Sequence, residues 1–207
     1  MPVLHIDRLR FAYPDGPPLI ADWSADVPAG VTLLHGDTGS GKSTVVRALA
    51  GELQATGQLR LGEVSLGADP RAYRAGVFCC DPATDRFHAL TPAECKAALH
   101  AGDAAADEAL WQALVEGFGL APHRDKKLFM LSTGSRRKVY LAAALSASHP
   151  LVLLDEPTGA LDAASVRCLT AALAAAPRRQ PHRAIVVASS GALEGVPLVA
   201  RFDLPLA

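Results

Sequence analysis

A glycine-rich segment at residues 36–43 constrains the fold of this chain more than any other feature. It has the sequence GDTGSGKS and fits the pattern G-x-x-x-x-G-K-[ST]. The glycines let successive backbone N–H groups point inward at the start of a helix, where they form a nest for phosphate groups. Lys42 supplies a positive charge for the β- and γ-phosphates, and the Ser43 hydroxyl is a candidate ligand for Mg²⁺. The segment therefore predicts a nucleotide-binding loop.

The sequence on either side of this loop supports the prediction. Val31–His35 is a compact apolar run typical of a buried strand, and Ser43–Leu53 has apolar residues on one face of a helix. A strand followed by a phosphate loop and a helix indicates an α/β domain that binds ATP with Mg²⁺. The predicted ATP contacts in the loop are Gly36, Asp37, Thr38, Gly39, Ser40, Gly41, Lys42, Ser43 and Thr44.

Two acidic residues follow a second apolar run. Asp155 and Glu156 come directly after Leu151–Leu154. Open α/β sheets bind ligands at the carboxyl ends of their strands, so this pair would lie beside the phosphate loop. We expect Asp155 to hold Mg²⁺ together with Ser43. We expect Glu156 to orient or deprotonate the attacking water, with Lys42 as the second catalytic residue.

The rest of the chain alternates strands with helices. Ala75–Cys80 and Ala184–Ala188 are predicted to be buried strands, and Ser135–Leu145 a helix. Thr91–Glu94 has the residues of a capping box and predicts the start of another helix, while Asp103 is expected to cap the helix after it.

This alternation predicts a single α/β domain over residues 1–207. Its nucleotide-binding core and β subdomain are expected in residues 1–81 and 146–207, and a helical subdomain at about residues 82–145.

Composition argues against several other classes of protein. The net charge is −1 and aromatic residues make up 5% of the chain, so we expect no nucleic-acid partner. The longest nearly apolar stretch, Tyr140–Leu154, is interrupted by polar residues and too short to cross a bilayer, and no signal peptide is visible at the N-terminus. The cysteines are scattered without metal-ligand spacing and are expected to be reduced; they are Cys79, Cys80, Cys95 and Cys168.

The histidines and the short charge runs have no pattern that indicates a site. No histidine pair has the spacing of a zinc site, so we expect the histidines, His35 among them, to be surface or structural residues. The basic run at residues 136–138 is expected to be a solvated helix face that could also touch nucleotide or a partner.

The order of the motifs resembles the ABC (ATP-binding cassette) ATPase family over nearly the whole chain. After the phosphate loop come LSTGS at residues 131–135, LLDEPT at 153–158 and ALD at 160–162. The resemblance implies a P-loop NTPase cassette with a mixed central sheet, an N-terminal antiparallel β layer and an inserted α-helical subdomain. It also implies an ATPase that powers a membrane transporter by ATP-driven dimerisation.

The resemblance further implies partners and more site residues. A second ABC ATPase subunit, in a homodimer or heterodimer, and an integral membrane permease would be the partners, with the chain peripheral on the cytoplasmic face of the membrane. Ser132 and Gly134 lie in the family's signature motif, which contacts ATP held by the opposing subunit. Tyr13 lies where the family stacks an aromatic ring on adenine; packing in the N-terminal β layer is the competing interpretation.

Three positions depart from the family pattern. Cys80 replaces a glutamine that reaches Mg²⁺ and the water; a thiol is a poor ligand for a hard cation, so that role is either lost or taken by Asp81. Ser190 replaces a histidine that clamps the γ-phosphate, and Thr133 replaces a glycine in the signature. These changes indicate slow hydrolysis or a degenerate site. The alternative function is a soluble nucleotide-gated switch or pseudo-ATPase not coupled to transport.

A third class, the DNA-repair and translation proteins of the family, fits less well. Those proteins carry a long coiled-coil insertion or a second cassette, and neither is visible in this sequence.

Overall fold

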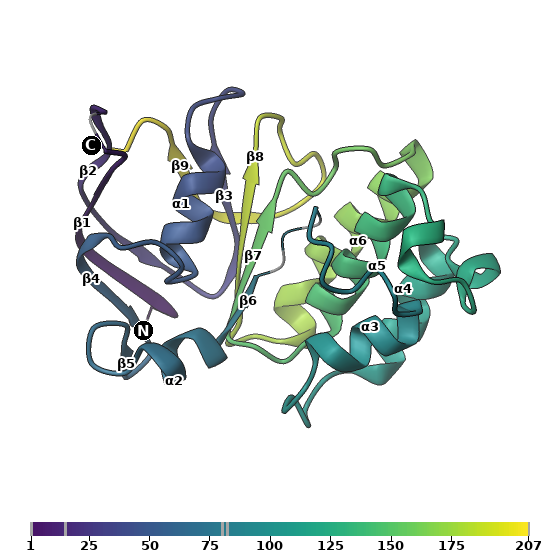
Figure 1. The fold of residues 1–207 in the computed structure, drawn as a ribbon. Coiled ribbons are helices and arrows are strands. Elements are labelled where there is room, and N and C mark those ends of the chain that lie inside the picture. Colours follow the sequence, from purple (N-terminus) through teal and green to yellow (C-terminus); the bar gives the residue numbers. More distant parts are fainter. Residues whose placement is uncertain (1, 15, 80, 82, 207) are drawn as a thin grey trace.

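The computed structural model describes residues 2–14, 16–79, 81 and 83–206. The chain forms two β-sheets, with helices gathered mainly beside the second sheet (Figure 1). The first sheet has four strands in the order β2-β1-β4-β5, paired antiparallel. Its strands are β1 (Leu4–Ala12), β2 (Pro18–Val27), β4 (Thr56–Leu61) and β5 (Val64–Ser65).

The second sheet has five strands in the order β6-β7-β8-β3-β9, and each neighbouring pair is parallel. Its strands are β3 (Gly30–His35), β6 (Val77–Cys79), β7 (Leu151–Asp155), β8 (Ala184–Ser189) and β9 (Leu198–Asp203). The expected mixed central sheet is not what the described residues form: all five strands are parallel, because the antiparallel hairpin strands make up the separate first sheet. The carboxyl ends of β3, β7 and β8 therefore meet at one edge of the sheet. The phosphate loop and the acidic pair leave the sheet at that edge.

The helices complete the fold. They are α1 (Lys42–Leu49), α2 (Pro70–Ala75), α3 (Pro92–Leu99), α4 (Glu108–Gly117), α5 (Thr133–Ser146) and α6 (Ala163–Arg179), with short 3₁₀ turns η1 (Ala121–His123) and η2 (Leu128–Met130). In Figure 1, α1 lies between the two sheets, while α3 to α6 lie together on the other side of the parallel sheet.

Alternate residues of the parallel strands face two separate cores. Leu34 and Leu153 pack with α1 and the antiparallel sheet. Their neighbours Leu33 and Leu154 pack with α5 and α6. This two-residue period is the expected pattern for strands buried on both faces, and it explains why these strands are continuous apolar runs.

Several local predictions are confirmed. The Thr91 side chain accepts from the backbone N–H of Glu94 at 3.3 Å, and the Glu94 carboxylate accepts from the N–H of Thr91 at 2.7 Å, which is the predicted capping box. These contacts, with Lys127, lower the pKa of Glu94 to about 2. The predicted strand Ala184–Ala188 lies within β8.

Other boundaries differ from prediction. Asp103 does not cap α4; Asp107 does, accepting from the backbone N–H of Leu110 at 2.8 Å. Asp103 instead accepts from the backbone N–H of Ser148 at 2.8 Å, a contact between residues 45 positions apart that no local pattern reveals.

The strand predicted at Ala75–Cys80 is shorter than expected, and the structure describes it only as Val77–Cys79. Its first predicted residue, Ala75, instead ends α2. This helix was not predicted, although Asp69 caps it and Pro70 occupies its first turn, which is a common start signal.

Within the described residues, no helix is long and apolar enough to cross a membrane. The boundary of the helical subdomain at about residues 82–145 stays a prediction.

Candidate functional site

The phosphate loop leaves the start of α1 open. The residue before the helix, Gly41, has φ of 98°, and no side chain caps the helix there. The first backbone N–H groups of α1 have no partner within the helix, and the helix dipole makes this end attractive to anions. Gly39 also has a positive φ, of 82°, which glycine adopts without the cost other residues carry. The loop therefore has the backbone shape that the sequence motif predicts.

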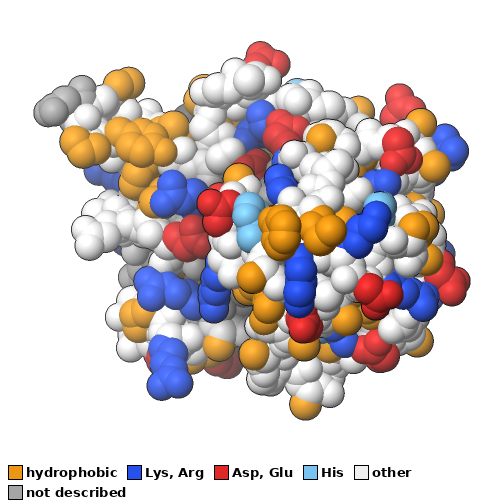
Figure 2. All heavy atoms as spheres, turned by 45° about the vertical axis from the view of Figure 1, so that its right-hand side comes forward, with side chains coloured by type: hydrophobic (Ala, Val, Ile, Leu, Met, Phe, Trp, Pro, Cys, Tyr) orange, Lys and Arg blue, Asp and Glu red, His pale blue; other side chains and the backbone are white. Residues whose placement is uncertain are grey.

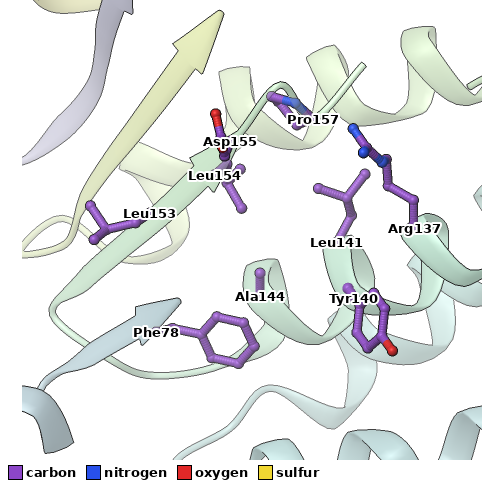
Figure 3. A pocket seen from close by; sticks show the side chains of 9 residues that line it. All are labelled: Phe78, Arg137, Tyr140, Leu141, Ala144, Leu153, Leu154, Asp155 and Pro157. Atoms are coloured by element: carbon purple, nitrogen blue, oxygen red, sulfur yellow. The ribbon is translucent and has the colours of Figure 1, made fainter. Parts of the chain in front are cut away.

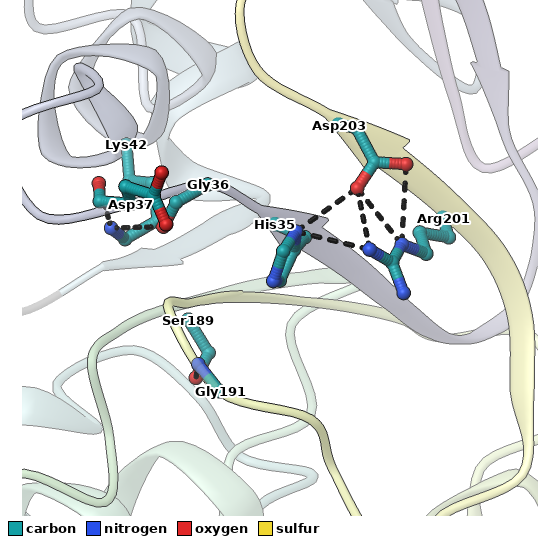
Figure 4. Close-up of polar contacts among 8 residues, drawn as sticks. All are labelled: His35, Gly36, Asp37, Lys42, Ser189, Gly191, Arg201 and Asp203. Carbon is teal, nitrogen blue, oxygen red and sulfur yellow. Dashed lines mark hydrogen bonds and ion pairs between the residues drawn. The ribbon is translucent and has the colours of Figure 1, made fainter.

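Lys42 is buried, with 5% of its surface exposed. Its Nζ donates to the backbone carbonyls of Gly36 at 2.8 Å and Asp37 at 2.9 Å (Figure 4). The same Nζ lies 3.1 Å from Oε1 of Glu156. The ammonium group is thus held at the mouth of the loop, between the phosphate nest and the acidic pair.

Glu156 is fixed in an unusual backbone conformation. Its φ is 41°, which costs a non-glycine residue on the order of 1 kcal/mol. Its N–H donates to the carbonyl of Ala188 at 2.8 Å, and its Oε1 accepts from the backbone N–H of Ser190 at 3.1 Å. Positive φ at a non-glycine residue clusters at active sites, which fits a catalytic role. The structure therefore brings Lys42, Glu156 and Ser190 together, and Ser190 contacts Glu156 through its backbone.

Asp155 and Ser43 line one cavity of about 280 Å³ at the carboxyl edge of the parallel sheet, together with Cys79 and Asp81. Oδ1 of Asp155 is buried and has no hydrogen-bond partner among the described residues. A buried carboxylate oxygen without a hydrogen-bond partner, in a cavity that a serine also lines, suits a hard cation, so these residues fit Mg²⁺. Asp81 lines the same cavity, and its role in place of the glutamine stays a prediction; Cys80 lies outside the described residues.

Tyr13 lies beside the phosphate loop. Its hydroxyl is 2.8 Å from Oγ1 of Thr44 in α1, and its ring packs edge-on against Phe11. The residue as a whole remains 48% exposed. The packing interpretation is thus satisfied on one edge only, and the exposed face is available to a planar ligand.

The signature segment forms the start of α5. Ser132 caps the helix, and its Oγ accepts from the backbone N–H of Ser135 at 3.1 Å. Within the described parts of the chain, the hydrogen bonds of the Ser132 side chain stay inside this helix turn. Gly134 packs against the carbonyl of Ala160, where a Cβ atom would overlap the oxygen. The structure does not bring these residues into contact with the phosphate loop of the same chain.

The segment 156–162 is also held by two members of the basic run that the sequence suggests is a solvated face. Arg137 of α5 donates to the carbonyl of Glu156. Lys138 lies 2.6 Å from Oδ2 of Asp162, and this lysine, with the Ser165 N–H, holds the pKa of Asp162 well below its usual range. Three consecutive cations near a helix start, at residues 136–138, were the signal that could have found them.

A polar cluster joins the strand before the phosphate loop to β9. Nδ1 of His35 lies 3.0 Å from Oδ1 of Asp203, which also accepts from Arg201 at 2.7 Å (Figure 4). The Arg201 contact holds the pKa of Asp203 below its usual range. These contacts of His35 fit the structural role expected of it, at the edge of the sheet.

Comparison with known proteins places the chain in a family. The family model described as ABC transporter matches residues 21–159. The cytochrome c biogenesis ATP-binding export protein CcmA of Paramagnetospirillum magneticum is 39% identical over 149 residues, covering 70% of this chain and 69% of that protein. CcmA of Rhodospirillum rubrum is 38% identical, covering 69% of this chain and 61% of its own length. The cobalt import ATP-binding protein CbiO of Rhodobacter capsulatus is 32% identical over 179 residues, covering 81% of this chain and 63% of that protein.

Solved structures show the same fold. The ATP-binding subunit of an ABC transporter has a TM-score of 0.76 at 21% identity, covering 90% of this chain and 79% of that one. An ABC transporter ATP-binding protein from Pyrococcus furiosus has a TM-score of 0.77 at 18% identity, covering 97% of this chain and 96% of that one. The chain spans about three fifths to two thirds of the length of the relatives it matches in sequence. The predicted cassette fold is confirmed, and the chain belongs to the ABC transporter family.

Proposed function

We propose that this chain is the ATP-binding and ATP-hydrolysing subunit of a membrane transporter. The observation that carries the proposal is the meeting of Lys42, Glu156 and the N–H of Ser190 at the mouth of an uncapped phosphate loop. Together they supply a cation for phosphate, a carboxylate for the attacking water and a backbone donor that orients the carboxylate.

The reaction follows from this geometry. The phosphates of ATP bind the N–H groups at the start of α1, and Lys42 exchanges its contact with Glu156 for the β- and γ-phosphates. Mg²⁺ held by Ser43 and Asp155 would neutralise developing charge on the phosphates. Glu156 accepts a proton from the water as the water oxygen attacks the γ-phosphorus. The bond from that phosphorus to the bridging oxygen breaks, and ADP and phosphate leave.

The partners of the chain follow from its family and its exposed signature. Ser132 and Gly134 do not contact the chain's own phosphate loop, so we infer that they serve ATP bound to a second ABC subunit, in a homodimer or heterodimer. The names of the relatives mention export and cobalt import, which supports a permease partner and a place on the cytoplasmic face of the membrane.

The exposed surface of the chain offers room for such partners. On the face in Figure 2, hydrophobic side chains lie among interspersed basic and acidic ones. Phe129 and Met130, just before the signature, are 62% and 58% exposed. Neighbouring exposed hydrophobic side chains of this kind are typical of protein or membrane interaction surfaces, which supports a partner at this place.

A second candidate function is a nucleotide-gated switch or pseudo-ATPase with little turnover. It is favoured by the contact at Ser190, which reaches Glu156 through the backbone while its short side chain replaces the family's histidine. Cys80 and Thr133 are the other two departures. In a homodimer both ATP sites would carry all three changes, whereas a heterodimer with an intact partner would divide them.

The test is Mg²⁺-dependent ATP hydrolysis, with ATP binding measured on the same samples. Lys42→Ala removes a charged donor to phosphate and should weaken ATP binding by on the order of 100-fold. Glu156→Gln keeps the shape but removes the base, so ATP binding should persist while turnover falls by about 100-fold or more. The matched controls are Lys126→Ala and Glu63→Gln, which change exposed residues far along the chain from both motifs.

The outcomes separate the two functions. Turnover lost in both site variants and retained in both controls supports the ATPase. ATP binding without turnover in the unmodified chain supports the switch. A chain that does not bind ATP would contradict both.

A further inference from the structure

One face of α5 contacts the segment that carries the catalytic glutamate. Gly134, Arg137 and Lys138 are spaced i, i+3, i+4 and therefore share a face of the helix. Gly134 packs against the carbonyl of Ala160, and Lys138 pairs with Asp162 at 2.6 Å. Between them, Arg137 donates to the carbonyl of Glu156. The first two turns of α5 are thus joined to residues 156–162 at three points.

The Arg137 guanidinium fits a space made for it. A Cβ atom at Gly159 would lie 2.8 Å from Nη1 of Arg137, so glycine leaves the room that the guanidinium occupies. The side chain reaches toward Pro157 across a small cavity of about 20 Å³ between α5 and β7 (Figure 3). Its Nε is buried with no hydrogen-bond partner among the described residues. The nitrogen of Arg137 that donates a hydrogen bond to the Glu156 carbonyl is Nη1.

The charges at the start of α5 are not explained by the helix itself. The first turn has no acidic residue, although the partial positive charge of a helix start favours one, and residues 136–138 are all basic. The dipole effect falls off within the first turn, so it has little influence on Arg137, which lies in the second turn. What distinguishes Arg137 is a contact outside its own helix, with the Glu156 carbonyl.

The conformation of Glu156 depends on contacts at both ends of the residue. Its N–H is held by Ala188, and its carbonyl accepts from Arg137 and from the N–H of Gly159 at 3.0 Å. A positive φ of 41° persists only where the surroundings hold the backbone on both sides. Rotation of this backbone would swing the carboxylate away from Lys42, which lies 3.1 Å from it.

We propose that Arg137 is a positioning residue that holds the backbone of Glu156 and so aims its carboxylate. The inference rests on the proposed function, in which Glu156 is the base. It links the first turns of the signature helix to the backbone of the residue that carries the catalytic carboxylate of the same chain. Arg137 itself contacts no substrate; it acts through Glu156.

The test compares Arg137→Ala and Arg137→Lys with Arg167→Ala, which removes an exposed arginine from α6. A misplacement of about 1 Å at a catalytic group can cost about 100-fold, so Arg137→Ala should lower kcat by about 10- to 100-fold with KM for ATP within about twofold. Lysine supplies one charged donor and should restore part of the loss, and Arg167→Ala should leave kcat unchanged. In a Glu156→Gln background, Arg137→Ala should cause no further loss, because the two residues act as one unit.

A second measurement is independent of turnover. Hydrogen exchange at the amides of Glu156 and Gly159 should become about 10-fold faster in Arg137→Ala, with the buried strand amide of Val187 unchanged. If the unmodified chain shows no turnover, the ATPase proposal fails while exchange still decides the role of Arg137. Unchanged exchange at both amides, or a kcat loss that adds fully to that of Glu156→Gln, would overturn the inference.

Discussion

Two helix starts in this chain, those of α1 and α5, have similar sequences and opposite local structures. The start of α1 follows Gly41 and has no side-chain cap, so its N–H groups remain available. The start of α5 is capped by Ser132, whose Oγ already accepts from the N–H of Ser135. The first is a ready anion site within its own chain, whereas Ser132 must give up a local contact before it accepts another partner.

The glycines of the two segments are required for different reasons. Gly39 of the phosphate loop has a φ of 82°, and a Cβ atom added there would meet no atom within 4 Å, so glycine is needed for its conformation. Gly134 of the signature has no such φ but lies against the carbonyl of Ala160, so glycine is needed for space. The phosphate loop is shaped by its own backbone, whereas the start of α5 is shaped by its contact with a distant segment.

The largest expected effect comes from adding a methyl group to Gly134, at the start of α5. Gly134→Ala should lower the free energy of unfolding by about 1–3 kcal/mol, because a backbone carbonyl cannot move aside as a side chain can. Gly39→Ala should cost about 1 kcal/mol, from the positive φ alone. Urea unfolding without nucleotide measures both.

The control for these glycine variants is Gly67→Ala. Gly67 has no positive φ, and its nearest neighbour, Oγ of Ser65, is 3.9 Å from the position of the added carbon. This change should stay within about 0.5 kcal/mol of the unmodified chain. A loss at Gly134 that is smaller than the loss at Gly39 would contradict the role given to the contact with Ala160.

The next largest expected effect is a difference in stability between substitutions of Ser132 and of Ser43. Ser132→Ala removes the cap of α5 and should cost about 1 kcal/mol of unfolding free energy. Ser43→Ala removes no cap and should change stability by less than about 0.5 kcal/mol. In ATP-binding assays, Ser43→Ala should instead raise the Mg²⁺ concentration at which ATP binding is half-maximal. A larger stability loss at Ser43 than at Ser132 would contradict the conclusion that Ser132 caps its helix and Ser43 does not.

The smallest effect is a pH dependence at the α5 contact. Lys138 and the Ser165 N–H lower the pKa of Asp162 in the folded chain, so its contribution to stability is present above the unfolded value of about 4. That contribution is lost as pH falls below this value toward the folded pKa. Asp162→Asn should therefore be less stable than the unmodified chain at about pH 7, with the gap narrowing as the pH falls below about 4. Urea midpoints measure the gap, and a gap that widens on acidification would contradict the assignment.

Much of the fold could be predicted from sequence because its signals are local. The apolar runs of β3, β7 and β8 are continuous, and the capping box at Thr91 uses residues three positions apart. Prediction failed at α2, whose local start signal at Asp69 and Pro70 was overlooked, and at Asp103, where a distant partner decided the outcome. Asp103 resembles a helix cap in sequence, but it accepts instead from the N–H of Ser148 at 2.8 Å.

In the candidate site, too, local motifs could be predicted from the sequence, whereas contacts between distant segments could not. The phosphate loop and the Asp155–Glu156 pair could be found from sequence, since each motif is complete within a few residues. The role of Ser190 was expected from its side chain, and the structure places its backbone N–H on Glu156. The contact of Arg137 was missed, because a charge run on a helix does not reveal what its members touch.

The sequence by itself determined the nucleotide loop, the acidic pair and the family. These depend on glycine conformations, a lysine and two carboxylates whose order along the chain is enough to recognise them. Only the tertiary structure decided how Lys42, Glu156, Ser190 and Arg137 meet, since they come from four segments spread over more than a hundred residues. The positive φ of Glu156 belongs to this second group, because a strained backbone is maintained by its neighbours in space and not by its neighbours in sequence.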